Sequence, residues 1–109
     1  MEEGKLQRNI ETVAVVVQHL VDVEFAKAGA VVPGSALDQA GLSDGLRIVR
    51  EYLQHGEPGV ALDHVLYMIR ELDLMIPADT YAALVDVVRT MKVGRDKLKG
   101  VRVSAPHAG

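Results

Sequence analysis

The sequence predicts an all-α protein, a single-domain bundle of about four amphipathic helices. Apolar residues recur at intervals of three and four in four segments, approximately residues 5–28, 42–55, 58–72 and 77–92. This spacing places the apolar side chains of each segment on one side of a helix. Glycine or proline stands near most of the boundaries between the segments. Four amphipathic helices joined by mostly short loops form a bundle, in which each helix covers the apolar side of another.

The first segment, residues 5–28, is richer in apolar residues than one side of a helix requires. Its expected buried stripe consists of Leu6, Ile10, Val13, Val17 and Leu20. Further apolar residues lie outside that stripe, namely Ala14, Val15, Val16, Val21 and Val23. Branched residues favour strands, so residues 12–17 are also compatible with a strand, but the helical period persists through the segment. The excess indicates either a central helix that several neighbours cover or a homodimer face.

Turn-forming residues mark the connection between the first two helices, residues 29–41. Pro33-Gly34 predicts a turn, and Ser35 is placed to cap a short helical turn that runs to Asp38. Ser43 is the expected N-cap of the second helix, because a serine hydroxyl can accept a hydrogen bond from a free N–H of the first turn. The second helix is expected to turn three residues inward, and these are Leu46, Val49 and Leu53.

The joint between the second and third helices predicts a rigid helical hairpin. Gly56 suits the left-handed backbone position just after a helix ends. Pro58 fits the first turn of the next helix, where its missing N–H costs nothing, and Glu57 is the expected cap before it. Because the joint contains so few residues, we expect the two helices to form one rigid, acidic unit.

Two further helices and a tail complete the predicted chain. The third helix has an apolar stripe of Leu62, Val65, Leu66, Ile69 and Leu72. The fourth has Tyr81, Leu84, Val85, Val88 and Met91, and Gly94 is its expected end. We therefore assign residues 1–93 to a helical bundle domain and residues 94–109 to a basic, partly disordered C-terminal tail. Within that tail we expect Leu98 to dock only loosely, and the last few residues to be disordered.

The net charge of −3 is unevenly distributed along the chain. Residues 1–92 carry eight Lys or Arg against fourteen Asp or Glu, a net charge of −6, while residues 93–109 carry four against one, a net charge of +3. An acidic body argues against binding to a phosphate backbone, which needs clustered cations, and fits a partner with a basic surface. Mild acidity also keeps a protein soluble. The basic tail indicates a solvated segment, a contact with the acidic helices or, as a third hypothesis, a contact with nucleic acid.

The sequence suggests no reaction, cofactor or metal site. The chain has no cysteine, which excludes disulfides and thiolate chemistry. The joint at residues 56–59 contains a proline, which lacks an amide donor, and no lysine follows it, so the joint does not match a phosphate-binding loop. Glu51, His55 and Glu57 lie close together, but the helix dipole already explains a histidine at a helix C-terminus. We expect His64 to face solvent and the protein not to be an enzyme.

Acidic residues and one tyrosine gather on the predicted hairpin. Asp44 and Glu51 are seven residues apart and therefore share one side of the second helix. The third helix carries two more carboxylates on its outer side with a tyrosine between them. The candidate partner-binding residues are Asp44, Glu51, Glu57, Asp63, Tyr67 and Glu71. These carboxylates are typical of a solvated face or a recognition surface, because acid–base catalysis would need them in a cleft that shifts their pKa values.

Three stretches between Leu46 and Val93 carry a resemblance to a known family. They are Tyr52-Leu53-Gln54-His55-Gly56-Glu57-Pro58-Gly59-Val60-Ala61-Leu62-Asp63, Leu72-Asp73-Leu74-Met75-Ile76-Pro77-Ala78-Asp79-Thr80-Tyr81 and Met91-Lys92-Val93. In order and spacing they resemble the small α-helical immunity proteins of bacterial toxin systems, the MafI-like and contact-dependent growth inhibition immunity family. The resemblance covers a little under half of the chain.

The resemblance implies a cytoplasmic antidote that binds the C-terminal domain of a cognate toxin, commonly a nuclease, and blocks its active site or substrate path. Nucleases hold phosphates with cations, so an acidic helical face fits their surface. We therefore expect a protein partner, no nucleic acid and no membrane; a dimerising helical assembly module is the alternative function. Met1-Glu2-Glu3 does not predict a secretory signal, and the longest apolar run, Val13–Val17, is too short to span a membrane.

Overall fold

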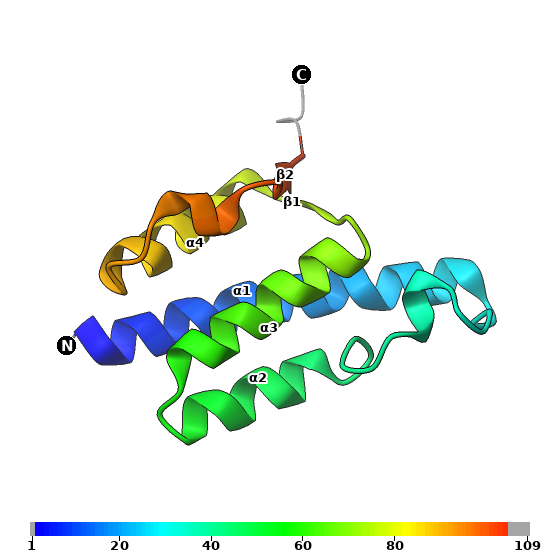
Figure 1. Ribbon diagram of the computed structural model, residues 1–109, viewed down its shortest axis with the longest axis horizontal. Coiled ribbons are helices and arrows are strands. Elements are labelled where there is room, and N and C mark those ends of the chain that lie inside the picture. Colours follow the sequence, from blue (N-terminus) through cyan, green and yellow to red (C-terminus); the bar gives the residue numbers. More distant parts are fainter. Residues whose placement is uncertain (1, 105–109) are drawn as a thin grey trace.

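The computed structural model describes residues 2–104 as four α-helices with short additional elements (Figure 1). In chain order these are α1 (Glu2–Ala28), the 3-10 helix η1 (Ala36–Asp38), α2 (Gly45–Gln54), α3 (Pro58–Glu71), β1 (Met75–Ile76), α4 (Ala78–Thr90), the 3-10 helix η2 (Arg95–Leu98) and β2 (Arg102–Val103). The four packed helices confirm the predicted all-α bundle. The two short strands, which pair in parallel, were not predicted.

α1 is the central helix and packs against α2, α3 and α4 (Figure 1). Ala14 and Val21, two of the residues outside the predicted stripe, are fully buried, whereas Val15 remains 44% exposed. Helix is therefore the correct prediction for residues 12–17, and three neighbouring helices account for much of the apolar excess within one chain. Val16 and Val23 are half-buried, so part of the apolar excess stays at the surface and the homodimer face remains a prediction.

The α2–α3 hairpin has the predicted joint. Gly56 has a left-handed backbone with φ of 71°, and Pro58 is the first residue of α3. The backbone N–H of Gly56 donates to Leu53 at 3.1 Å, and that of Glu57 donates to Tyr52 at 2.9 Å. These two bonds satisfy the last carbonyls of α2 and fix the direction of the chain. Glu57 stands at the expected cap position, but its side chain makes no capping hydrogen bond.

α3 and α4 end in the same geometry without a glycine. Asp73 and Lys92 have left-handed backbones, with φ of 48° and 59°. The N–H of the residue after each one donates back to the helix, from Leu74 to Ile69 at 2.9 Å and from Val93 to Val88 at 3.0 Å. The prediction that Gly94 ends the fourth helix is therefore wrong, because Lys92 adopts the turning position two residues earlier.

The start of α2 is held by a side chain from α1. Ser43 is not its cap, as we had predicted, because α2 begins at Gly45 and no neighbouring side chain makes a capping hydrogen bond. Instead, the Gln18 side-chain oxygen accepts from the N–H of Leu46 at 2.8 Å, and its Nε2 donates to the carbonyls of Leu42 at 3.1 Å and Ser43 at 3.3 Å. Gln18 is only 8% exposed, so water cannot easily replace it.

Residues 94–104, which we call the C-terminal segment, belong to the same fold as the helices. Leu98 is 2% exposed and lies in the core, where we had expected only loose docking. β2 pairs with β1 in the register Met75 to Arg102, and the N–H of Ser104 donates to Ile76 at 2.9 Å. The disorder predicted for the last few residues falls mainly on residues 105–109, outside the described part of the chain.

Candidate protein-binding surface

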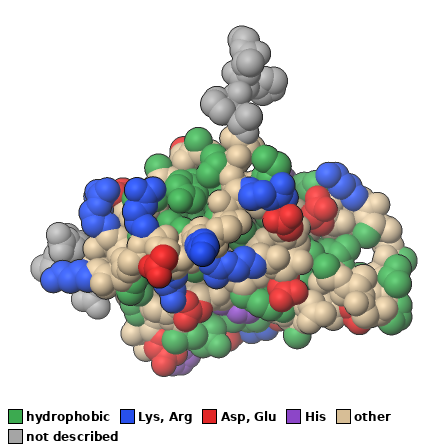
Figure 2. Space-filling view, turned by 45° about the horizontal axis from the view of Figure 1, so that its top comes forward, with side chains coloured by type: hydrophobic (Ala, Val, Ile, Leu, Met, Phe, Trp, Pro, Cys, Tyr) green, Lys and Arg blue, Asp and Glu red, His purple; other side chains and the backbone are tan. Residues whose placement is uncertain are grey.

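The structure does not bring the six predicted partner-binding residues together on one face. Asp44 and Glu51 lie on the side of α2 that borders α1, Glu57 lies at the tip of the hairpin, and the other three belong to α3. All five carboxylates are exposed, and Tyr67 is half-buried. On the face shown in Figure 2, acidic and basic side chains alternate rather than separate into two regions. The predicted acidic face is therefore divided into two sets of residues with different neighbours.

A cation sits between the two acidic residues of α2. One guanidinium nitrogen of Arg47 lies 2.7 Å from Asp44, and another lies 2.7 Å from Glu51. The hydrogen bonds to Asp44 and then Glu51 raise the pKa of Arg47. All three side chains are at least 45% exposed, so solvent screens the pairs and each contributes little to folding. A partner that meets this edge therefore finds one cation between two anions.

The C-terminal segment occupies one side of α3. The ammonium of Lys97 lies 2.8 Å from Asp63, and Arg70 donates to the backbone carbonyls of Lys97 at 2.6 Å and Lys99 at 3.3 Å. Arg102 forms a second ion pair, 2.9 Å from Asp73. The basic residues of the C-terminal segment thus contact acidic residues of the hairpin region, which is one of the alternatives that the sequence predicted for them. Asp63 is consequently less free to meet a partner than the sequence implied.

The other side of α3 holds the end of the connection from α1. The Tyr67 hydroxyl donates to the carbonyl of Ala40 at 2.6 Å, and His64 Nε2 lies 2.9 Å from the carbonyl of Gly41. His64 is half-buried, which corrects the prediction that it faces solvent. Burial and then the nearby charge of Glu71 raise the pKa of Tyr67. The hydroxyl of Tyr67 is therefore already engaged in a hydrogen bond within the chain.

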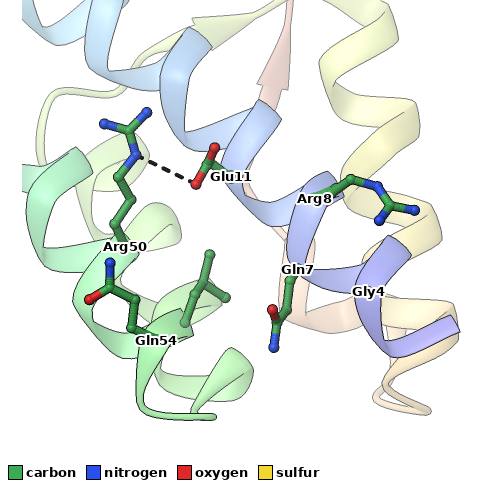
Figure 3. A pocket seen from close by; sticks show the side chains of 7 residues that line it. Gly4, Gln7, Arg8, Glu11, Arg50 and Gln54 are labelled. Atoms are coloured by element: carbon green, nitrogen blue, oxygen red, sulfur yellow. Dashed lines mark ion pairs between the residues drawn. The ribbon is translucent and has the colours of Figure 1, made fainter. Parts of the chain in front are cut away.

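A groove runs between the N-terminal half of α1 and the C-terminal half of α2 (Figure 3). Its volume is about 600 Å³. The lining side chains from α1 are Gln7, Arg8 and Glu11, and those from α2 are Arg50, Leu53 and Gln54. Arg50 and Glu11 face each other across the groove at 3.5 Å, as the dashed line in Figure 3 marks. The walls thus present both hydrogen-bond donors and acceptors to a bound molecule.

A second hollow of about 530 Å³ continues the groove toward the start of α2. The two hollows share Arg50 and Gln54, and Asp44 and Glu51 line the second one. We call the two hollows together the α1–α2 groove. It includes two of the six predicted residues and adds a wall of α1 that the sequence analysis did not identify. The spacing of Gln7, Glu11 and Gln18 could have indicated it, because intervals of four and seven place residues on one side of a helix.

Comparisons with models of protein families, with curated proteins and with solved structures find no match for this chain. Within residues 2–104, His, Asp and Glu side chains form no group of three that could hold a metal ion. No helix in this range is long and apolar enough to cross a membrane. The α1–α2 groove and the carboxylates beside it are thus the principal candidates for a binding surface.

Proposed function

We propose that the protein is an immunity protein, which binds the C-terminal domain of a cognate bacterial toxin, commonly a nuclease, in the cytoplasm and neutralises it. The observation that carries this proposal is the α1–α2 groove with Glu51 on its wall. The resemblance to immunity proteins also supports this proposal. Gly56 and Pro58 belong to the stretch that carries the resemblance, and they form a rigid joint beside the groove. The protein contributes shape and charge rather than a reaction.

The proposed contact lies on the α2 side of the hairpin. Glu51 and Glu57 are exposed at one end of the molecule, and neither carboxylate is buried against the C-terminal segment. A nuclease surface that binds phosphates is rich in cations, so these carboxylates accelerate association and favour the correct partner. Gln7 and Gln54 supply neutral hydrogen-bonding groups, which can fix the register of a bound segment.

Co-expression with the neighbouring gene product tests the proposal directly. We would express the C-terminal domain encoded by the reading frame immediately upstream, with and without this protein, and measure growth and co-purification. Relief of toxicity together with a stable complex is the expected result. A harmless neighbour, or toxicity that this protein does not relieve, would contradict the proposal.

Two matched double variants locate the contact. Glu51→Lys with Glu57→Lys changes the α2 side, and Asp63→Lys with Glu71→Lys changes α3. Each pair adds the same charge and removes one ion pair, to Arg47 or to Lys97. We expect the first variant to weaken toxin binding at least about tenfold and the second less than about threefold, because the buried centre of an interface carries most of its energy.

Equal loss of affinity in the two variants would contradict the assignment to α2, as would a larger loss in the α3 variant. Thermal unfolding of each free variant checks that the fold is retained. Binding measured at low and high salt provides a further readout, since a charge-dominated contact weakens as salt rises. The α3 variant should retain the salt dependence of the wild type, and the α2 variant should lose part of it.

A further inference from the structure

A separate cavity lies where α4 ends and η2 begins, on the part of the chain that the α1–α2 groove does not include. Its volume is about 480 Å³, which is within the range of small-molecule sites. Three valines and three cations line it, and these are Val85, Val88, Val93, Arg89, Lys92 and Arg95. Gly94 completes the lining. We call this the α4–η2 cavity. It combines apolar walls with positive charge and is distinct from the proposed toxin contact.

The charge at the α4–η2 cavity is positive although the whole chain is acidic. Among the described residues, no Asp or Glu lines it. Asp86 lies beside the cavity, 3.5 Å from Arg89, and the Asp96 carboxylate lies next to Gly94. The end of α4 adds roughly half a negative charge. The three cations of the lining exceed these opposing charges by only about half a unit, so the excess of positive charge is confined to the cavity wall.

Lys92 occupies a backbone conformation that favours glycine. Its φ is 59°, and a side chain at such a position costs about 1 kcal/mol relative to glycine. No ion pair of Lys92 is present within residues 2–104 that would offset this cost. The same conformation ends α3 at Asp73, so it belongs to the helix end, and it places Lys92 at the cavity wall.

We propose that the α4–η2 cavity binds a small amphipathic anion, a carboxylate attached to an apolar chain. The valines cover the chain, because burial of apolar surface is favourable, and the cations hold the carboxylate through charge-assisted hydrogen bonds. A free fatty acid and a peptide that ends in apolar residues both have this chemistry. The inference does not depend on the toxin contact, which involves other helices.

Titration of the full-length protein followed by NMR tests the proposal. The signals of the methyl groups of Val85, Val88 and Val93 report on the cavity walls, and octanoate and the tripeptide acetyl-Gly-Leu-Leu are the two anionic probes. We expect saturable shifts of these methyl signals, with a dissociation constant on the order of 1 mM for the better probe. The tighter of the two probes identifies the source of the carboxylate.

Octylammonium and acetate are the control ligands, since each lacks one of the two required features. We expect neither to shift the valine signals with saturation. The triple variant Arg89→Gln, Lys92→Gln, Arg95→Gln should weaken binding of octanoate roughly tenfold, because it removes the charged donors. The matched variant Lys5→Gln, Lys27→Gln, Lys99→Gln changes the net charge equally at exposed residues outside both the cavity and the α1–α2 groove, and it should leave binding unchanged.

Three results would overturn the proposal. The first is the absence of saturable shifts with both anionic probes. The second is equal binding of octylammonium, which would indicate a purely apolar surface. The third is equal weakening in the two triple variants, which would indicate a response to net charge rather than to the cavity. All the substituted residues of the first triple variant are exposed, so we expect that variant to remain folded.

Discussion

The two longest segments outside the four helices are held to the bundle in different ways. The connection from α1 to α2, residues 29–44, is anchored near its end, by its own buried Leu42 and by hydrogen bonds from Gln18 of α1 and from His64 and Tyr67 of α3. Its first half leaves Val32 65% exposed. The C-terminal segment also places one leucine, Leu98, in the core, but it is held in addition by the pairing of β2 with β1.

The comparison teaches that each segment combines one buried leucine with its own hydrogen bonds, and that these two kinds of interaction differ in size. Loss of Leu98 would remove apolar contacts and leave a cavity, and such losses are usually large. Loss of an anchor of the connection would leave backbone groups without hydrogen-bond partners, which costs less per group and depends on access of water. The following substitutions test this difference, beginning with the largest expected effect.

Leu98→Ala should destabilise the protein most, by about 2–4 kcal/mol, because it removes a fully buried side chain from the core. Urea unfolding followed by circular dichroism measures the change in the free energy of unfolding. Val103→Ala is the control, since Val103 belongs to the same segment but is exposed, and it should cost less than about 1 kcal/mol. Equal effects would mean that the segment does not contribute to the core.

Gln18→Ala should cost about 2 kcal/mol, because it leaves the N–H of Leu46 and the carbonyl of Leu42 without their partner. Hydrogen exchange of the Leu46 amide should accelerate more than that of amides in α3. Gln7→Ala is the matched control on α1, because the Gln7 side chain has no hydrogen bond within the described residues, and it should be nearly neutral. Unchanged protection of Leu46 would contradict the anchoring role of Gln18.

Tyr67→Phe should cost about 1 kcal/mol at neutral pH by removing the hydroxyl that donates to Ala40. The pKa of Tyr67 is raised in the folded protein above its usual value of 10.0. Its neutral form therefore stabilises the fold fully below about pH 10, and this contribution is lost as pH rises through the raised pKa. The phenylalanine variant should show a smaller loss of stability in alkali.

Tyr52→Phe is the control for that measurement, since Tyr52 is also half-buried and its hydroxyl has no hydrogen bond within the described residues. We expect its stability to fall with rising pH as that of the wild type does. Thermal unfolding between pH 8 and pH 11 would compare the three proteins. A Tyr67 variant with the same alkaline profile as the wild type would show that the hydroxyl of Tyr67 is not responsible.

The local features of the sequence were sufficient to predict the helices and one joint. Periodic apolar residues identified all four helices, and Gly56 with Pro58 identified the α2–α3 joint. Both signals depend on residues within a few positions of one another, so they are read directly from the chain. The helix ends at Asp73 and Lys92 were harder to predict, because these residues adopt a left-handed backbone that glycine normally marks.

The candidate surface was predicted only in part. The acidic residues of the hairpin were identified as exposed, but their partners could not be, because Lys97 is thirty-four positions from Asp63 in the sequence and only 2.8 Å from it in the structure. The α1 wall of the groove was missed for a related reason. A groove exists only where two helices meet, and their crossing is set by packing rather than by either helix alone.

By itself, the sequence determined that this chain is helical, where its hairpin turns and which of its helices carry carboxylates, because helical period, turn chemistry and charge are local properties. Only the tertiary structure decided that α1 lies at the centre, that Gln18 rather than Ser43 holds the start of α2, and that Leu98 joins the core. These outcomes depend on the burial of residues distant in sequence. Burial determines which polar groups lose water and must find partners within the protein.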